Sequence, residues 1–466
     1  MSFIISAYFF AFCAAVGFIK VSIPSSPCSS ELNRAVFTSF IFFPVAVIAI
    51  AAVANVFNSF LGIAGMYTVL RYMFYFFIGA FFIAVITTVR GRPVHYGFGI
   101  FPPMLLASFI LVVGNWPLPI FGWDAIGFWT AYAADFLNYA SQGITEPFTY
   151  WNYKHPRTAS YIQILSYGFW PDHRDSISLI PLNFLMVALP IYGFFKLWAI
   201  NNFNRYSLVL PILVVSSIPL LENQITIAGY AEVYLFSLIL VVCALIALRK
   251  YFSKPHIVVA AAYASAAMLM TLKTIGPYIF LLLIVAHIII SLKPTSRACG
   301  IIALLAVSSV FLIYVYGVSF AFFGHHFELN ASFHSVKMGG WEMPIEFNGL
   351  AEIFTITMVA FAINNSFGIW PLAIIVALAY LQKNKVRFSM DAVLIATFGF
   401  LILTLICLHA VLTQYGLNHA LPGADTGFSR FSLAGFAPSV IVLIMIIFQE
   451  NEKQADGHGR TRVGVL

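Results

Sequence analysis

The sequence contains little charge. Asp, Glu, Lys and Arg make up only 9% of the chain, against about 25% in soluble proteins. Apolar residues make up 61%. A soluble fold cannot bury that much apolar surface, whereas a bilayer accepts it as a solvent does. The composition therefore argues against soluble domains and predicts a single bundle of many helices.

Cysteine is also scarce, and no internal repeat or soluble nucleotide-binding domain is evident. The five cysteines are scattered and lack the spacing of a metal site. None falls in a predicted outer loop, so no disulfide framework is expected. The cysteines are Cys13, Cys28, Cys243, Cys299 and Cys407. The missing nucleotide-binding domain argues against a cytoplasmic nucleotide-sugar donor.

Long apolar stretches dominate what the chain does contain. A spanning helix needs about 20 apolar residues, and we predict about 13 spans. They are residues 2–19, 35–56, 68–89, 98–118, 177–198, 206–221, 231–248, 256–271, 276–292, 299–320, 354–381, 389–412 and 431–448. The expected fold is an all-α, polytopic transmembrane bundle with interfacial helices in its outer loops. The first span has no basic n-region, so we expect a retained helix rather than a signal peptide.

Basic residues predict the sidedness of the protein, because cytoplasmic loops collect Lys and Arg. With the N-terminus outside and the C-terminus inside, most of the 24 basic residues lie on the cytoplasmic side and most of the 17 acidic ones outside. The net charge of +7 comes from these short basic clusters. We therefore expect no nucleic-acid partner.

Three regions follow from this topology. Residues 1–97 are expected to form N-terminal transmembrane helices, residues 98–448 a transmembrane catalytic module, and residues 449–466 a cytoplasmic tail. The longest non-spanning stretches, 119–176 and 321–353, are both predicted to be outer loops. Any reaction is therefore expected at the outer membrane–water boundary.

The first outer loop contains a predicted amphipathic helix from Asp124 to about Ala140. Apolar and aromatic residues recur there at three- and four-residue steps, and a short helix of this kind lies in the interface. Asp124 would sit at its N-terminal end beside Trp123. Asp124 could act in catalysis, or it could be an N-cap that accepts from free backbone N–H groups.

A basic and aromatic cluster follows in the same loop. Lys154, His155 and Arg157 lie within four residues and follow Tyr150, Trp151 and Tyr153. These side chains could hold a phosphate or a sugar. The alternative is an ordinary interfacial anchor, because aromatic and basic residues are common at membrane boundaries.

Five short motifs in this order resemble the GT-C superfamily of integral-membrane glycosyltransferases. They begin at Trp123, His155, Gly229, Lys273 and Ser429, and read Trp-Asp-Ala, His-Pro-Arg-Thr-Ala, Gly-Tyr-Ala-Glu, Lys-Thr-Ile-Gly and Ser-Arg-Phe-Ser-Leu. Their order and spacing resemble one bacterial branch of the family along residues 115–448.

The chain departs from the family pattern at four positions. Arg157 stands where the family has an acid, and Glu232 is longer than the family's Asp by one methylene. Ile275 and Gly276 replace Asn and Glu. The first three spans are also additional to the simplest members.

The resemblance implies transfer of a sugar from a polyprenyl-phosphate donor on the periplasmic face of a bacterial inner membrane. The acceptor would be a lipid-linked glycan or another cell-envelope component. The step implied is an inverting displacement with Asp124 as base. No cofactor is required, although the superfamily allows Mg²⁺ or Mn²⁺ at this Asp.

Other residues are candidates for binding the donor and the acceptor. Arg430 and Lys273 are candidate donor-phosphate ligands, because fixed cations stabilise developing negative charge and ions at membrane depth are functional by default. The alternative for both is snorkelling to the headgroups. His155 and Arg157 are further candidate phosphate ligands. Candidate ligands for the sugar or the acceptor are Glu232, Tyr230, Trp123 and Lys154. Glu232 could instead simply pair with Lys273.

Other sites and functions are also conceivable. His325, His326 and His334 could indicate a metal, but no carboxylate completes an obvious site, so no metal site is predicted. The chain could be a transporter or flippase for lipid-linked sugars, which paired broken helices would favour. It could also be an O-antigen polymerase or ligase type of enzyme, which would not require the Asp124 helix.

Overall fold

A computed structural model describes most of the chain. The residues described are 2–22, 28–89, 107, 110, 132–133, 135–136, 156–166, 179–198, 209–226, 230–292, 296–316, 319–322, 325–328, 335–338, 341–355, 367–368, 370–384, 389–413 and 427–457.

Most of the described residues are α-helical, because a chain in hydrocarbon must satisfy its backbone polar groups internally. The helices of the first half are α1 (Ser2–Ser22), α2 (Cys28–Val89), α5 (Thr158–Ser166), α6 (Leu179–Trp198), α7 (Val209–Ser217), α8 (Pro219–Thr226) and α9 (Glu232–Leu248). Those of the second half are α10 (Pro255–Ala267), α11 (Gly276–Ser291), α12 (Ser296–Tyr316), α14 (Trp370–Asn384), α15 (Met390–Leu412) and α17 (Gly427–Gly457). Two 3₁₀ turns, η4 (Arg249–Tyr251) and η5 (Met268–Thr271), extend α9 and α10.

Within the described ranges, five helices are long and apolar enough to cross a membrane, or six if the bent pair α7–α8 is one span. The five lie at Arg34–Asn58, Leu179–Trp198, Glu232–Tyr251, Met390–Leu412 and Arg430–Ile447. Shorter apolar helices include α11 and the α10–η5 segment. The prediction of a multi-pass helical membrane protein is therefore confirmed.

The segment predicted as one span at 206–221 is instead sharply bent. Helices α7 and α8 meet at 99°. Pro219 begins α8, and its ring and missing N–H favour the start of a new helix over continuation of α7. Gly368 packs against this break, where an added Cβ would lie 2.6 Å from the Ser217 carbonyl oxygen.

One outer loop differs from the prediction, and one helix extends beyond its predicted span. Residues 319–344 contain two antiparallel hairpins, in which β1 (Ser319–Phe322) pairs with β2 (His325–Glu328) and β3 (Ser335–Met338) with β4 (Trp341–Pro344). They occupy part of the outer loop 321–353, for which no strands were predicted. Helix α17 also continues to Gly457, beyond the predicted end of its span at residue 448.

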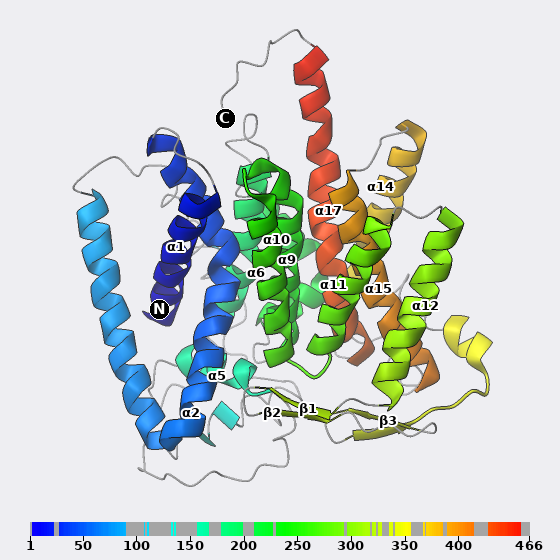
Figure 1. Cartoon of the computed structure of the whole chain (residues 1–466), viewed down its shortest axis with the longest axis horizontal. Coiled ribbons are helices and arrows are strands. Elements are labelled where there is room, and N and C mark those ends of the chain that lie inside the picture. The colour runs from blue at the N-terminus through cyan, green and yellow to red at the C-terminus, as the bar shows by residue number, and fades with distance from the viewer. Residues whose placement is uncertain are drawn as a thin grey trace.

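The hairpins and α5 lie at one end of the bundle, whereas α17 extends beyond the other helices at the opposite end (Figure 1). We call the first the outer end and the second the inner end, after the predicted sidedness. The turn between η5 and α11 and the first residues of α9 and α17 also lie at the outer end (Figure 1). Residues 90–106 are outside the described ranges, so the boundary predicted near residue 97 stays a prediction.

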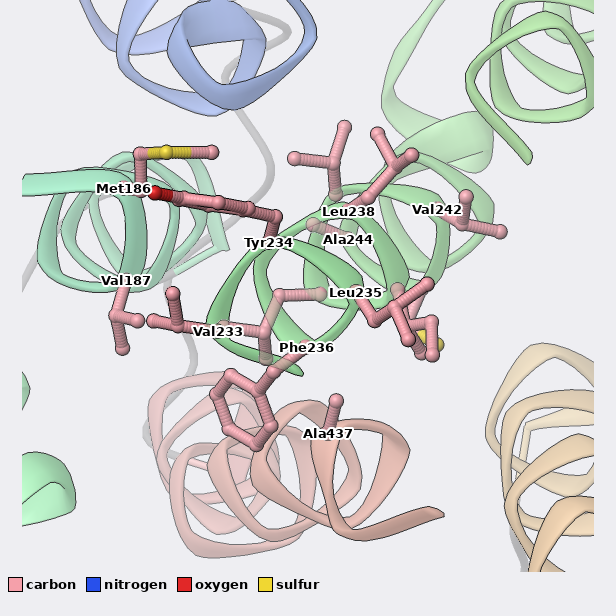
Figure 2. Packing of buried hydrophobic residues seen from close by; sticks show 14 of the residues in the cluster. Met186, Val187, Val233, Tyr234, Leu235, Phe236, Leu238, Val242, Ala244 and Ala437 are labelled. Carbon is pink, nitrogen blue, oxygen red and sulfur yellow. The ribbon is translucent and has the colours of Figure 1, made fainter. Parts of the chain in front are cut away.

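Helix α9 forms the centre of the bundle. All of its residues are buried, and it packs between α6 and α17. Figure 2 shows Tyr234 directed toward Met186 of α6, and Phe236 toward the side that carries Ala437 of α17. Because α9 is fixed on all sides, its first residue, Glu232, is held rigidly at the outer end.

Candidate functional site

A buried ion pair lies at the outer end of the bundle. The Lys273 ammonium nitrogen is 2.5 Å from a carboxylate oxygen, Oε1, of Glu232. Only 9% of the Lys273 side chain and 3% of the Glu232 side chain are exposed. Lys273 therefore does not snorkel to the headgroups. Of the two roles open to Glu232, pairing with Lys273 is the one observed.

Arg430 joins this pair from the first turn of α17. Its guanidinium carbon lies 4.8 Å from the centre of the Tyr230 ring, and the Lys273 nitrogen lies 4.4 Å from the centre of the Phe431 ring. The charges of Lys273 and Arg430 both act on the Glu232 carboxylate. We call Tyr230, Glu232, Lys273, Arg430 and Phe431 the outer cluster.

The outer cluster carries an excess of positive charge. Two of its five residues, Lys273 and Arg430, are cations, and both act on the one carboxylate among the five, Glu232. Arg430 is 8% exposed and Lys273 7%, so water screens their charges only weakly. A buried cation attracts an anion far more strongly than an exposed one does, so two such cations are suited to binding an anionic group.

One buried polar atom of the cluster, and one of the residue that follows Lys273, lack partners within the described part of the chain. They are Oε2 of Glu232 and the hydroxyl of Thr274. A buried polar atom without a hydrogen bond costs about 1–3 kcal/mol. Such atoms call for an explanation, and a bound water or ligand hydroxyl is the simplest one.

Local backbone features position these side chains. Glu232 opens α9, where a carboxylate is favoured by the helix dipole. Lys273 lies in the turn between η5 and α11, and Gly276 closes that turn. A Cβ added at Gly276 would lie 1.9 Å from the carbonyl oxygen of Leu269, so only glycine permits this close backbone approach.

Arg157 belongs to a second group. Its guanidinium donates to the Tyr132 hydroxyl at 3.2 Å and lies 4.9 Å from the centre of that ring. Tyr132 and Phe136 both pack against Tyr161 of α5. Burial raises the pKa of the Tyr161 phenol well above its ordinary range, so it stays protonated at neutral pH. This group packs the described residues of the predicted interfacial helix onto α5.

The remaining predicted site residues lie outside the described residues. They are Asp124, Trp123, Lys154 and His155. Their roles stay predictions, including that of Asp124 as base. Among the side chains that the structure describes, no three His, Cys, Asp or Glu residues come together in a way that could hold a metal ion.

Sequence reasoning did not identify Phe431, Thr274 or Tyr132 as parts of these groups. Phe431 and Thr274 directly follow residues that were identified, Arg430 and Lys273, so adjacency was an available signal. Tyr132 had no such signal, because its partner Arg157 lies 25 residues away.

Comparison with known proteins adds no relative. No family model matches the chain, and neither a curated protein nor a solved structure is similar to it.

Proposed function

We propose that the chain is a membrane glycosyltransferase that moves a sugar from a polyprenyl-phosphate donor to a lipid-linked or other cell-envelope acceptor. The reaction takes place on the periplasmic face of a bacterial inner membrane. The fold proposed is the GT-C-like bundle of about 13 spans expected from the sequence. The observation that carries the proposal is the outer cluster, in which two buried cations, Lys273 and Arg430, act on one carboxylate.

The charge of the cluster suits this donor. A polyprenyl-phosphate sugar is a phosphodiester with one negative charge, and two cations beside one carboxylate attract such an anion. When the sugar departs, the phosphate gains a second charge in the transition state. Fixed cations in a site of low dielectric stabilise that developing charge. Arg430 is suited to contact two phosphate oxygens at once, because its guanidinium is a planar fork.

Neighbouring atoms would bind the sugar. Oε2 of Glu232 and the hydroxyl of Thr274 have no partner within the described residues, and each can hydrogen-bond to a sugar hydroxyl. Tyr230 and Phe431 supply the aromatic faces beside the two cations. Lys273 stays paired with Glu232 and neutralises it, so the carboxylate does not repel the phosphate.

The chemical step is a displacement at the anomeric carbon. The acceptor hydroxyl oxygen forms the new bond as the bond to the phosphate oxygen breaks, and the electron pair goes to the phosphate. The hydroxyl proton goes to Asp124, a role that rests on the resemblance alone. An ordinary Asp pKa of about 3.9 makes a weak base, which partial burial would strengthen. No cofactor is required, and Mg²⁺ or Mn²⁺ at Asp124 is a variant of the same step.

The test is transfer by the purified protein in nanodiscs supplied with a panel of polyprenyl-phosphate sugars and acceptors. Release of polyprenyl phosphate is measured for the wild type, Asp124→Asn and a control, Lys254→Gln. Lys254 is an exposed cation at the inner end, before α10. We expect release by the wild type and the control and its loss in Asp124→Asn. If Asp124→Asn releases polyprenyl phosphate at the wild-type rate, Asp124 is not the base, and its role as a helix cap remains.

A transporter or flippase for lipid-linked sugars is the second candidate, and the bent pair α7–α8 favours it. Transporters place substrate sites at discontinuous helices. The side chain of Gln224 on α8 is fully buried, and neither of its amide atoms has a partner within the described part of the chain. Movement of a fluorescent lipid-linked sugar across proteoliposomes, without bond cleavage, would favour this function.

A further inference from the structure

A groove lies between α10 and α11 in the inner half of the bundle, away from the outer cluster. Its volume is about 300 Å³, and it is lined by Tyr263, Ile284, His287, Ile288, Ser291 and Leu292. Ile288 is 51% exposed and Leu292 62%. The groove therefore opens on the side of the helix bundle, and in a membrane lipid covers this side.

The wall of the groove contains a polar pair. The Tyr263 hydroxyl and Nδ1 of His287 are 2.9 Å apart and share a hydrogen bond. Tyr263 lies eight residues into α10 and His287 four residues before the end of α11. At 1.5 Å per residue, they lie roughly 12 Å and 6 Å from the inner ends of these helices.

Polar groups at this depth are expensive on a lipid-facing surface and tend to be functional. Among the described residues, the pair leaves one donor unused, whichever nitrogen carries the proton. If Tyr263 donates to Nδ1, the Nε2–H of His287 remains. If Nδ1–H donates to the Tyr263 oxygen, the phenol proton remains. The matching partner is an acceptor at the edge of the hydrocarbon.

We propose that this groove binds a glycerophospholipid of the inner leaflet. One acyl chain lies along Ile284, Ile288 and Leu292, and an ester carbonyl accepts a hydrogen bond from the Tyr263–His287 pair. Ester carbonyls lie where the acyl chains begin, near the hydrocarbon boundary. A polyprenyl chain has no acceptor along its length and would leave the pair without a partner. The site is independent of the proposed transferase activity.

The test uses native mass spectrometry of the delipidated full chain, titrated with dioleoyl phosphatidylglycerol or its ether-linked analogue, which lacks the carbonyls. One hydrogen bond is worth about 1 kcal/mol, or about fivefold in affinity. We expect the ether lipid to bind the wild type about fivefold more weakly than the ester lipid. The double variant Tyr263→Phe/His287→Leu should bind both lipids equally.

A second pair of variants tests the groove itself. Ile288→Trp fills it, whereas Leu304→Trp adds the same bulk to α12, where residue 304 is 66% exposed. Only Ile288→Trp should reduce lipid binding. Equal binding of ester and ether lipids by the wild type, or equal effects of the two Trp variants, would overturn the proposal. The proposal would also be overturned if the wild type formed a dimer in place of the lipid-bound monomer and Ile288→Trp abolished that dimer.

Discussion

Glu232 and Lys273 are 41 residues apart in the sequence, yet their side chains meet at 2.5 Å inside the outer end of the bundle. The pair joins the start of α9 to the turn before α11. Arg430, from the first turn of α17, acts on the same carboxylate. Three segments that are distant in the chain therefore converge on one charged cluster, which is the basis of the proposed function.

Removal of Lys273 should destabilise the protein strongly. Lys273→Met leaves the Glu232 carboxylate buried without its partner, and breaking a buried pair costs about 3–5 kcal/mol. Lys273→Met/Glu232→Leu removes both charges and should recover much of that loss. Thermal unfolding in one detergent, compared across the two single variants and the double variant, measures the coupling. If the fall in melting temperature of the double variant equals the sum of the falls in the two single variants, the two side chains are not coupled, which would contradict the pairing.

The ion pair at the inner end is a matched control for that experiment. Arg249 and Asp391 approach to 2.6 Å, but 31% of the Arg249 side chain is exposed. Only 9% of the Asp391 side chain is exposed, but water reaches the Arg249 guanidinium and screens the pair in part, so its contribution lies nearer the roughly 0–1 kcal/mol of exposed pairs. We expect Arg249→Gln to lower the melting temperature less than Lys273→Met does and to leave sugar transfer unchanged. If Arg249→Gln loses as much sugar transfer as Lys273→Met does, the loss is not specific to the outer cluster, which would contradict the proposed site.

Gly276→Ala should disturb the turn that carries Lys273. Its Cβ would meet the Leu269 backbone at 1.9 Å, so the turn must move, at a cost of roughly 1–3 kcal/mol. Gly300→Ala in α12 is the matched control, because nothing lies within 4 Å of its Cβ and alanine favours a helix by about 1 kcal/mol. The melting temperature should fall in the first variant and hold or rise in the second.

Gly368→Ala tests the packing at the bend between α7 and α8. Gly368 has φ +54° and its Cβ would crowd Ser217 and Pro219, whereas Gly349 has φ +73° and open space around it. Both substitutions incur the backbone strain of a positive φ, which is about 1–2 kcal/mol. Only Gly368→Ala adds a clash, so it should lower the melting temperature further. Equal shifts would mean that Gly368 does not hold the bend.

The sequence predicted the long apolar helices better than it predicted the bend between α7 and α8 or the short hairpins. The apolar run of α9 is long enough to identify a buried span from composition alone. The bend at Ile218 had a signal in Pro219, but the flanking residues are apolar on both sides and read as one span. The hairpins at 319–344 are strands of four residues each, too short for an alternating pattern to be distinctive.

The sequence identified three residues of the outer cluster but not their arrangement. Glu232, Lys273 and Arg430 were identified from the motif resemblance and from their places at predicted outer helix ends. The sequence could not decide whether Glu232 binds sugar or pairs with Lys273, because that depends on how α9 and α11 pack. Arg157 was expected beside a phosphate, and its observed contact with Tyr132 depends on packing between α5 and the preceding loop.

Arg430 provides the most direct test of the central claim. In nanodiscs, the wild type, Arg430→Gln and Arg430→Lys are compared for release of polyprenyl phosphate at equal folded protein. We predict that Arg430→Gln releases polyprenyl phosphate at least about a hundredfold more slowly than the wild type. A loss of this size is typical when an enzyme loses one group that stabilises the transition state. Arg430→Lys should recover part of it, because the charge remains but the two-point contact is lost. Wild-type rates in Arg430→Gln would contradict the assignment of the outer cluster as the donor-phosphate site.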